Sequence, residues 1–161
     1  MGTYASDGSD ADATGMRFGI VAGRFNRAVS ERLLEGVERV LSERGVAEAN
    51  VTVAWVPGAF EIPLVAQRLA ASGTVDAVIC VGAVIRGDTA HFEYVAGPCA
   101  DGVLRVALDT GIPVVFGVLT TENLEQATDR TGGREGHKGE EAALTAIEMV
   151  SLLGSLPGEG E

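Results

Sequence analysis

Continuous apolar runs alternate along this chain with segments of helical periodicity, and this alternation limits the fold more than any other feature. Residues 77–85 read Ala-Val-Ile-Cys-Val-Gly-Ala-Val-Ile. A strand without polar side chains is typical of a parallel sheet that is covered on both faces. We expect further strands over residues 16–22, 51–56 and 113–119, and helices over about 29–44, 62–69, 91–109 and 140–153. The pattern predicts an α/β fold, a three-layer αβα sandwich around a four-stranded parallel sheet.

The length of the chain suits one such domain. At 161 residues it has the usual size of a single domain, which we expect over residues 16–153. Residues 1–15 contain Gly, Ser, Asp, Ala and Thr and lack the basic start and apolar stretch of a signal peptide. They predict a disordered N-terminal tail, and residues 154–161 a flexible C-terminal tail. Within residues 16–153 the element order predicts a flavodoxin-like topology.

The net charge and the cysteine content limit the kinds of partner and metal site that this protein can have. The formal net charge of −11 argues against nucleic acid and anionic membranes as partners, and an anionic substrate would need a local basic site. No apolar run reaches the roughly 18 residues of a membrane span. Cys80 and Cys99 have no second Cys or His at metal-ligand spacing, so we expect buried free thiols, no metal site and a cytoplasmic protein.

The turn around Glu61 can build a binding site. Pro57 and Gly58 end the second strand, and Pro63 fits the first turn of the next helix. Glu61 therefore lies beside unpaired backbone N–H groups, where a carboxylate is favoured and can accept hydrogen bonds from a hydroxylated ligand. The alternative is a helix-capping acid with Phe60 packed into the core.

The loop that ends at His91 is a second candidate. A helix N-terminus favours the neutral imidazole, which suits a proton donor or acceptor, although a lone histidine is more often structural or merely exposed. Backbone N–H groups of Asp88 and Thr89 can hold a small phosphate there. The chain has no Gly-x-Gly-x-x-Gly after the first strand and no nucleoside triphosphate loop motif.

Two further features follow the loop that ends at His91. A short helix after the fourth strand would be capped by Thr120 or Thr121 and carry Glu122 in its first turn. Residues 130–138 then place three cations among glycines. Arg130 is the best candidate for a bidentate phosphate contact, and a solvated loop is the alternative.

Five motifs together resemble the 6,7-dimethyl-8-ribityllumazine synthase family, in the same order along the chain. They are Gly23-Arg24-Phe25-Asn26, Trp55-Val56-Pro57-Gly58-Ala59-Phe60-Glu61-Ile62-Pro63, Gly82-Ala83-Val84-Ile85-Arg86-Gly87-Asp88-Thr89-Ala90-His91-Phe92, Phe116-Gly117-Val118-Leu119-Thr120-Thr121-Glu122-Asn123 and Lys138-Gly139. The resemblance covers residues 16–153, and only the two tails fall outside it.

The resemblance implies an enzyme of riboflavin biosynthesis. Such enzymes condense 5-amino-6-(D-ribitylamino)uracil with 3,4-dihydroxy-2-butanone 4-phosphate, release phosphate and water, and need no cofactor or metal. By motif position, His91 would move protons, and Asp88, through its backbone, would hold the phosphate with Thr89 and Arg130. The residues implied for binding the ribitylaminouracil are Phe25, Ala59, Phe60, Glu61, Ala83, Val84, Ile85, Phe116 and Lys138, with Phe116 contributed by a neighbouring subunit.

The resemblance also implies a homopentamer. The short stretch 132–139 resembles the connection of members that assemble into a sixty-subunit icosahedral shell, which can hold riboflavin synthase, and the residues before Phe18 would pair with a neighbour's sheet edge.

Three other functions are alternatives to catalysis. A non-catalytic flavin-binding or lumazine-binding or shell protein could dispense with His91 and Arg130, an electron carrier would need a Ser/Thr-rich first loop, and archaeal-type riboflavin synthase is disfavoured by the motif at 57–63.

Overall fold

The computed structural model, which describes residues 1–5 and 11–158, contains one four-stranded parallel sheet. Its strands are β1 (Phe18–Gly23), β2 (Val51–Val56), β3 (Ala77–Ile85) and β4 (Val114–Thr121), in the order β2-β1-β3-β4. Phe18 pairs with Val51 on one side and Ala77 on the other. Because all four strands are parallel, their carboxyl ends meet at one end of the sheet.

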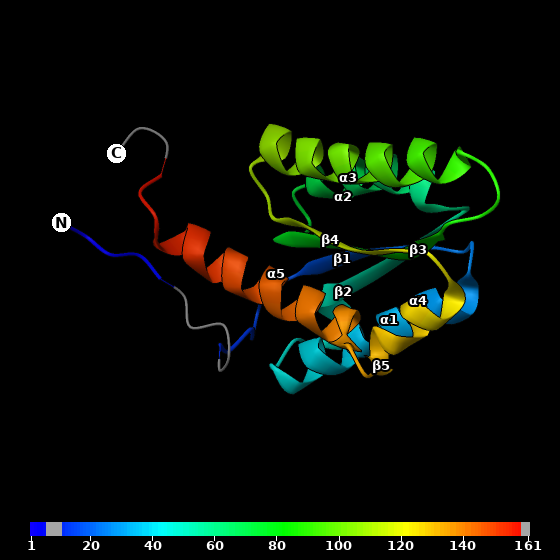
Figure 1. Cartoon of the computed structure of the whole chain (residues 1–161). Helices are drawn as coiled ribbons and strands as arrows, with labels where there is room; N and C mark the ends of the chain where they lie inside the picture. Colours follow the sequence, from blue (N-terminus) through cyan, green and yellow to red (C-terminus); the bar gives the residue numbers. More distant parts are fainter. Residues whose placement is uncertain (6–10, 159–161) are drawn as a thin grey trace.

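Helices cover both faces of this sheet (Figure 1). Helices α2 (Ile62–Ala70) and α3 (His91–Thr110) lie on one face, and α1 (Arg27–Glu43), α4 (Leu124–Asp129) and α5 (Lys138–Ser155) lie on the other. Two short 3-10 helices, η1 (Glu48–Asn50) and η2 (Ala59–Glu61), flank β2. The expected three-layer αβα sandwich is confirmed. None of the described helices is both long enough and apolar enough to cross a membrane.

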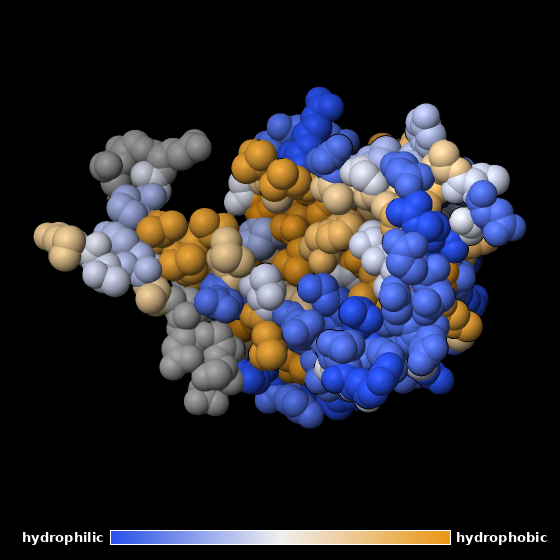
Figure 2. All heavy atoms as spheres, in the orientation of Figure 1, coloured by the Kyte–Doolittle hydropathy of each residue, from blue (hydrophilic) through white to orange (hydrophobic). Residues whose placement is uncertain are grey.

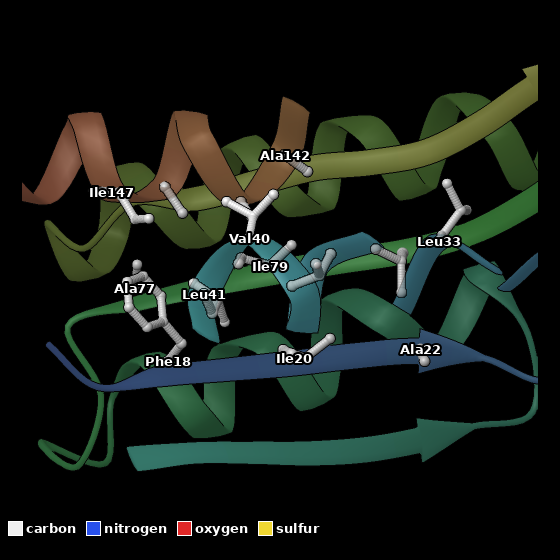
Figure 3. Packing of buried hydrophobic residues seen from close by; sticks show 14 of the residues in the cluster. Phe18, Ile20, Ala22, Leu33, Val40, Leu41, Ala77, Ile79, Ala142 and Ile147 are labelled. Carbon is white, nitrogen blue, oxygen red and sulfur yellow. The ribbon is translucent and has the colours of Figure 1, made fainter. Parts of the chain in front are cut away.

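The two central strands, β1 and β3, are apolar because they are buried between two hydrophobic layers. Every residue of β1 and the first eight residues of β3 are buried. On one side Phe18 and Ile20 pack with Ile79 against α1 and α5, as Figure 3 shows. On the other side Val21 and Val78 pack against α2 and α3. Burial of each such side chain contributes about 1.5–3 kcal/mol.

Helices α1 and α5 approach closely through glycines. A Cβ added to Gly139 would lie 2.1 Å from the Leu33 carbonyl oxygen, and one added to Gly36 would lie 2.1 Å from Cε1 of His137. A side chain at Gly139 would therefore force the two helices apart, and one at Gly36 would displace the His137 ring. This contact fixes the start of α5, and with it Lys138.

Several boundaries differ from the prediction. Strand β4 continues to Thr121, so neither Thr120 nor Thr121 caps the next helix; the Asn123 side chain accepts a hydrogen bond from the Gln126 N–H at 2.9 Å instead. Glu122 lies before that helix. Register with β3 explains the longer strand, since Thr121 pairs with Ile85.

Residues 130–139 also differ. They contain a two-stranded hairpin of β5 (Thr131–Gly133) and β6 (Gly136–His137). Helix α5 begins at Lys138, before the predicted Glu140, because the His137 imidazole Nδ1 accepts a hydrogen bond from the Glu140 N–H at 3.3 Å. A side-chain cap of this kind sets the first turn.

Part of each predicted tail lies outside the described residues, at 6–10 and 159–161. Ala13 is buried in the core, and its N–H donates to the Arg44 carbonyl at 2.9 Å. The packed body therefore includes residues before Met16. The assignment of residues 1–15 and 154–161 as tails otherwise stays a prediction.

Candidate functional site

A cavity of about 980 Å³ lies at the carboxyl ends of β1, β2 and β3. Chain connections leave β1 and β3 toward opposite faces of the sheet (Figure 1), and such a switch point is where ligands bind in open parallel sheets. We call it the β1–β3 cavity. Its lining includes nine of the predicted site residues: Phe25, Ala59, Phe60, Glu61, Ala83, Val84, Ile85, Thr89 and His91.

Hydrogen bonds tie the three loops of the cavity together. Asn26 has the left-handed conformation (φ 59°) that asparagine tolerates, and its side-chain Nδ2 donates to the Ala83 carbonyl at 3.2 Å. The N–H groups of Arg24 and Phe25 donate to the carbonyls of Val56 and Pro57, at 2.8 and 3.1 Å. The first loop is thereby joined to the loops after β2 and β3.

The structural alternatives for Glu61 and Phe60 are not observed. Glu61 is the N-cap residue of α2, but its side chain accepts no capping hydrogen bond. Phe60 is 59% exposed and Phe25 is 75% exposed. A Cβ added to Gly58 would lie 3.4 Å from Glu61 Oε2 and 3.8 Å from the Cβ of Phe25, so this glycine lies close to both side chains. A carboxylate that has no hydrogen-bonding partner in residues 1–5 and 11–158 thus lines, with two exposed rings, a cavity that can take a flat, hydroxylated ligand.

His91 is the first residue of α3 and is exposed. Its backbone N–H donates to the Thr89 hydroxyl at 3.3 Å. Within the described part of the chain the imidazole has no hydrogen-bonding partner, and it lines the cavity. The ring is therefore available to a ligand as donor or acceptor.

Asp88 lies between two lining residues, Gly87 and Thr89, but does not itself line the cavity. Both Asp88 and Thr89 are exposed at the start of α3. Their backbone N–H groups lie in the turn that precedes α3, a position at which a helix can bind an anion.

The other three predicted residues line a separate hollow of about 360 Å³ beside β4, which we call the β4 hollow. It contains Phe116 on β4, Arg130 at the end of α4 and Lys138 at the start of α5, and it shares no lining residue with the β1–β3 cavity. The guanidinium of Arg130 donates to the Gln126 carbonyl at 2.9 Å, and its other donors have no partner in the part of the chain that the structure describes. A single chain does not bring these residues into the β1–β3 cavity.

Sequence reasoning missed the contribution of α3. Tyr94, Val95 and Pro98 also line the cavity. They lie three, four and seven residues after His91, which is the spacing of one helix face. That periodicity was the available signal, but the same spacing is equally typical of a helix face packed into the core.

Both cysteines are buried free thiols, as predicted. Burial raises the pKa of Cys99 to about 11 and raises the pKa of Cys80 further, so neither is a nucleophile at neutral pH. In the described residues no group of three or more His, Cys, Asp or Glu side chains is arranged to hold a metal ion.

Comparison with known protein families assigns the chain to a family. The model of the family described as 6,7-dimethyl-8-ribityllumazine synthase matches residues 15–154, which include every residue of both hollows. The match spans far more than half of the 161-residue chain. The chain therefore belongs to the 6,7-dimethyl-8-ribityllumazine synthase family.

Proposed function

We propose that the β1–β3 cavity is where this chain condenses 5-amino-6-(D-ribitylamino)uracil with 3,4-dihydroxy-2-butanone 4-phosphate, the reaction of its family. One observation carries the assignment: exposed aromatic rings line the same cavity as a carboxylate and an imidazole that have no partner among the described residues. A non-catalytic flavin-binding, lumazine-binding or shell protein would need the rings and Glu61, but not His91.

The ribitylaminouracil occupies the apolar part of the cavity. Phe25 stacks on the pyrimidine, while Ala59 and Phe60 contact the ring and the ribityl chain. Glu61 accepts hydrogen bonds from ribityl hydroxyls, which its uncapped carboxylate supports. The carboxyl end of β3 closes the floor, since its side chains there are short or apolar: Ala83, Val84 and Ile85.

The butanone phosphate binds at the start of α3. Backbone N–H groups of Asp88 and Thr89 contact the phosphate there, and the Asp88 carboxylate takes no part because it would repel the anion. The lining of the β1–β3 cavity contains no Lys or Arg. Arg130 therefore supplies the cation, through a guanidinium fork that matches phosphate oxygens, and Lys138 lies near the pyrimidine.

His91 moves the protons. Imine formation, phosphate elimination and ring closure each require a proton transfer, and one neutral imidazole can serve all three. Most of the rate enhancement comes from holding two substrates in register. This mechanism uses no cofactor.

The active site is completed between subunits. Phe116, Arg130 and Lys138 lie in a hollow separate from the β1–β3 cavity, so a neighbouring chain must supply them. Apolar side chains that could pack against that neighbour are exposed on α2 and α3: Leu64 at 72%, Leu104 at 60% and Leu108 at 75%. Figure 2 shows a further apolar strip between α3 and α5, over β4.

We infer a homopentamer, assembled into an icosahedral shell in the cytoplasm that can enclose riboflavin synthase. The short hairpin at 131–137 supports the shell, since it adds no long insertion, and two buried free thiols suit a reducing compartment. A light-scattering mass of a single pentamer would contradict the shell.

The test mixes purified protein with both substrates and follows lumazine absorbance against a no-enzyme control. We expect acceleration over the spontaneous reaction, and a slower rate for His91→Ala. Folded, oligomeric protein that gives no acceleration would favour the non-catalytic alternative.

A further inference from the structure

The loop 87–90, between β3 and α3, has almost no packing of its own. All four of its residues are exposed, and a Cβ added to Gly87 would meet no atom within 4 Å. In the chain as far as the structure describes it, the loop's hydrogen bonds run only to the first turn of α3, at His91 and Glu93. The position of this loop therefore depends on how its two ends are held.

Arg86 holds both ends. Its backbone N–H donates to the Thr121 carbonyl at 2.9 Å, which anchors the end of β3 to β4. Its guanidinium donates through Nη1 to Glu93, in the first turn of α3, and through Nε to Glu122 at 2.8 Å. The guanidinium carbon also lies 4.4 Å from the centre of the Phe92 ring. One side chain thus closes the loop across residues 87–92 and joins it to the segment after β4.

These contacts show that Arg86 is not a free cation. Two carboxylates, Glu93 and Glu122, already face its guanidinium, and the hydrogen bond from Arg86 lowers the pKa of Glu93. A phosphate would have to displace them. A single exposed ion pair is weak, but here one planar group is shared by two carboxylates and a ring, and the three contacts act on the same loop.

We propose that Arg86, Glu93 and Glu122 form a clamp that positions the loop 87–90, and with it the phosphate-binding N–H groups of Asp88 and Thr89 and the imidazole of His91. Arg86 is a positioning residue and does not touch the substrate. The clamp lets the butanone phosphate meet an ordered loop, so that binding does not have to order it. The kinetic part of this inference rests on the proposed function, while the ordering of the loop does not.

The first measurement is hydrogen–deuterium exchange on the unliganded protein. In Arg86→Gln we expect the hydrogen-bonded amides of His91 and Glu93, whose acceptors lie in the loop, to exchange about tenfold faster than in the wild type, with the strands unchanged. Arg86→Lys keeps the charge without the planar fork and should recover part of the protection. Unchanged exchange in Arg86→Gln would overturn the proposal, whether or not the protein is active.

The second measurement is steady-state kinetics with each substrate varied. For Arg86→Gln we expect the KM for butanone phosphate to rise about tenfold, while the KM for ribitylaminouracil changes less than about twofold. Arg17→Gln is the matched control, since Arg17 also joins two segments, through Asp76 and the Gly73 carbonyl, but at the amino ends of the strands. If Arg86→Gln raises both KM values equally, and Arg17→Gln raises them by the same amount, Arg86 has only a structural role.

The two measurements separate the two hypotheses. Absence of condensation by the wild type would reject the proposed function, and the exchange experiment would then decide the clamp alone. A clear exchange effect without any change in the KM for butanone phosphate would show that the ordered loop does not serve phosphate binding, and would overturn that part of the proposal.

Discussion

The β1–β3 cavity and the β4 hollow lie at the same end of the sheet but are built differently. The cavity is formed by loops that hydrogen bonds tie to buried strands, and its lining has one carboxylate and no Lys or Arg. The β4 hollow depends on the packing of α5 against α1, and its lining contains Arg130 and Lys138. Neither has the full set of groups that the reaction needs, so the two surfaces are complementary. Under the proposed function, the β1–β3 cavity would bind the ring and the β4 hollow would supply the positive charge.

The largest effect is expected where the β4 hollow is supported. Gly139→Ala places a Cβ 2.1 Å from the Leu33 carbonyl oxygen, which should lower the free energy of unfolding by about 3 kcal/mol. Gly154→Ala is the control on the same helix, because nothing lies within 4 Å of its added Cβ. Urea denaturation of both variants measures the difference, and equal midpoints would show that α5 does not depend on this close approach.

The next largest effect belongs to the β1–β3 cavity. His91→Ala should lower kcat about a hundredfold, since it removes a proton donor and acceptor but leaves both binding surfaces intact. Catalysis above the spontaneous rate should persist because positioning of the substrates is retained. Stopped-flow or steady-state absorbance measures kcat, and full activity would remove His91 from the mechanism.

Arg130→Ala should affect the other region and another parameter. Loss of a charge-assisted contact costs about 2 kcal/mol, so we expect the KM for butanone phosphate to rise about thirtyfold, with little change in the KM for ribitylaminouracil. Arg134→Gln, in the same segment but paired with Asp129 at 2.9 Å, is the control. If only the KM for ribitylaminouracil changed, the roles assigned to the two regions would have to be exchanged.

A mixing experiment gives the smallest but most specific effect. If each site combines the β1–β3 cavity of one subunit with the β4 hollow of its neighbour, co-assembled His91→Ala and Arg130→Ala chains regain native sites. Random mixing in equal amounts makes about one site in four native in a closed ring. Activity is measured after the two variants are unfolded and refolded together, and activity that never exceeds the mean of the two single variants would place both regions in one subunit's site.

Local pattern was sufficient for much of the fold. Strands over 51–56 and 77–85 and the start of a helix at His91 agree with the prediction. Burial on both faces explains the continuous apolar side chains of 77–85, whereas 51–56 is an edge strand with exposed residues and is indicated by the Pro57-Gly58 turn that ends it. The extension of β4 to Thr121 was not predictable, since it depends on pairing with Ile85 in another strand. The hairpin at 131–137 was missed because its strands are short and rich in glycine.

The sequence by itself determined the α/β class, the apolar strands and the residue types at the strand ends, since these follow from periodicity and from backbone chemistry within a few residues. Only the tertiary structure decided which of those residues share a cavity. It brought Phe25, Glu61 and His91 together, separated them from Phe116 and Arg130, and paired Arg86 with carboxylates seven and thirty-six positions away. The reason is physical: strand order and helix packing set the distances between segments that are far apart in the chain. A local sequence pattern does not contain information about those distances.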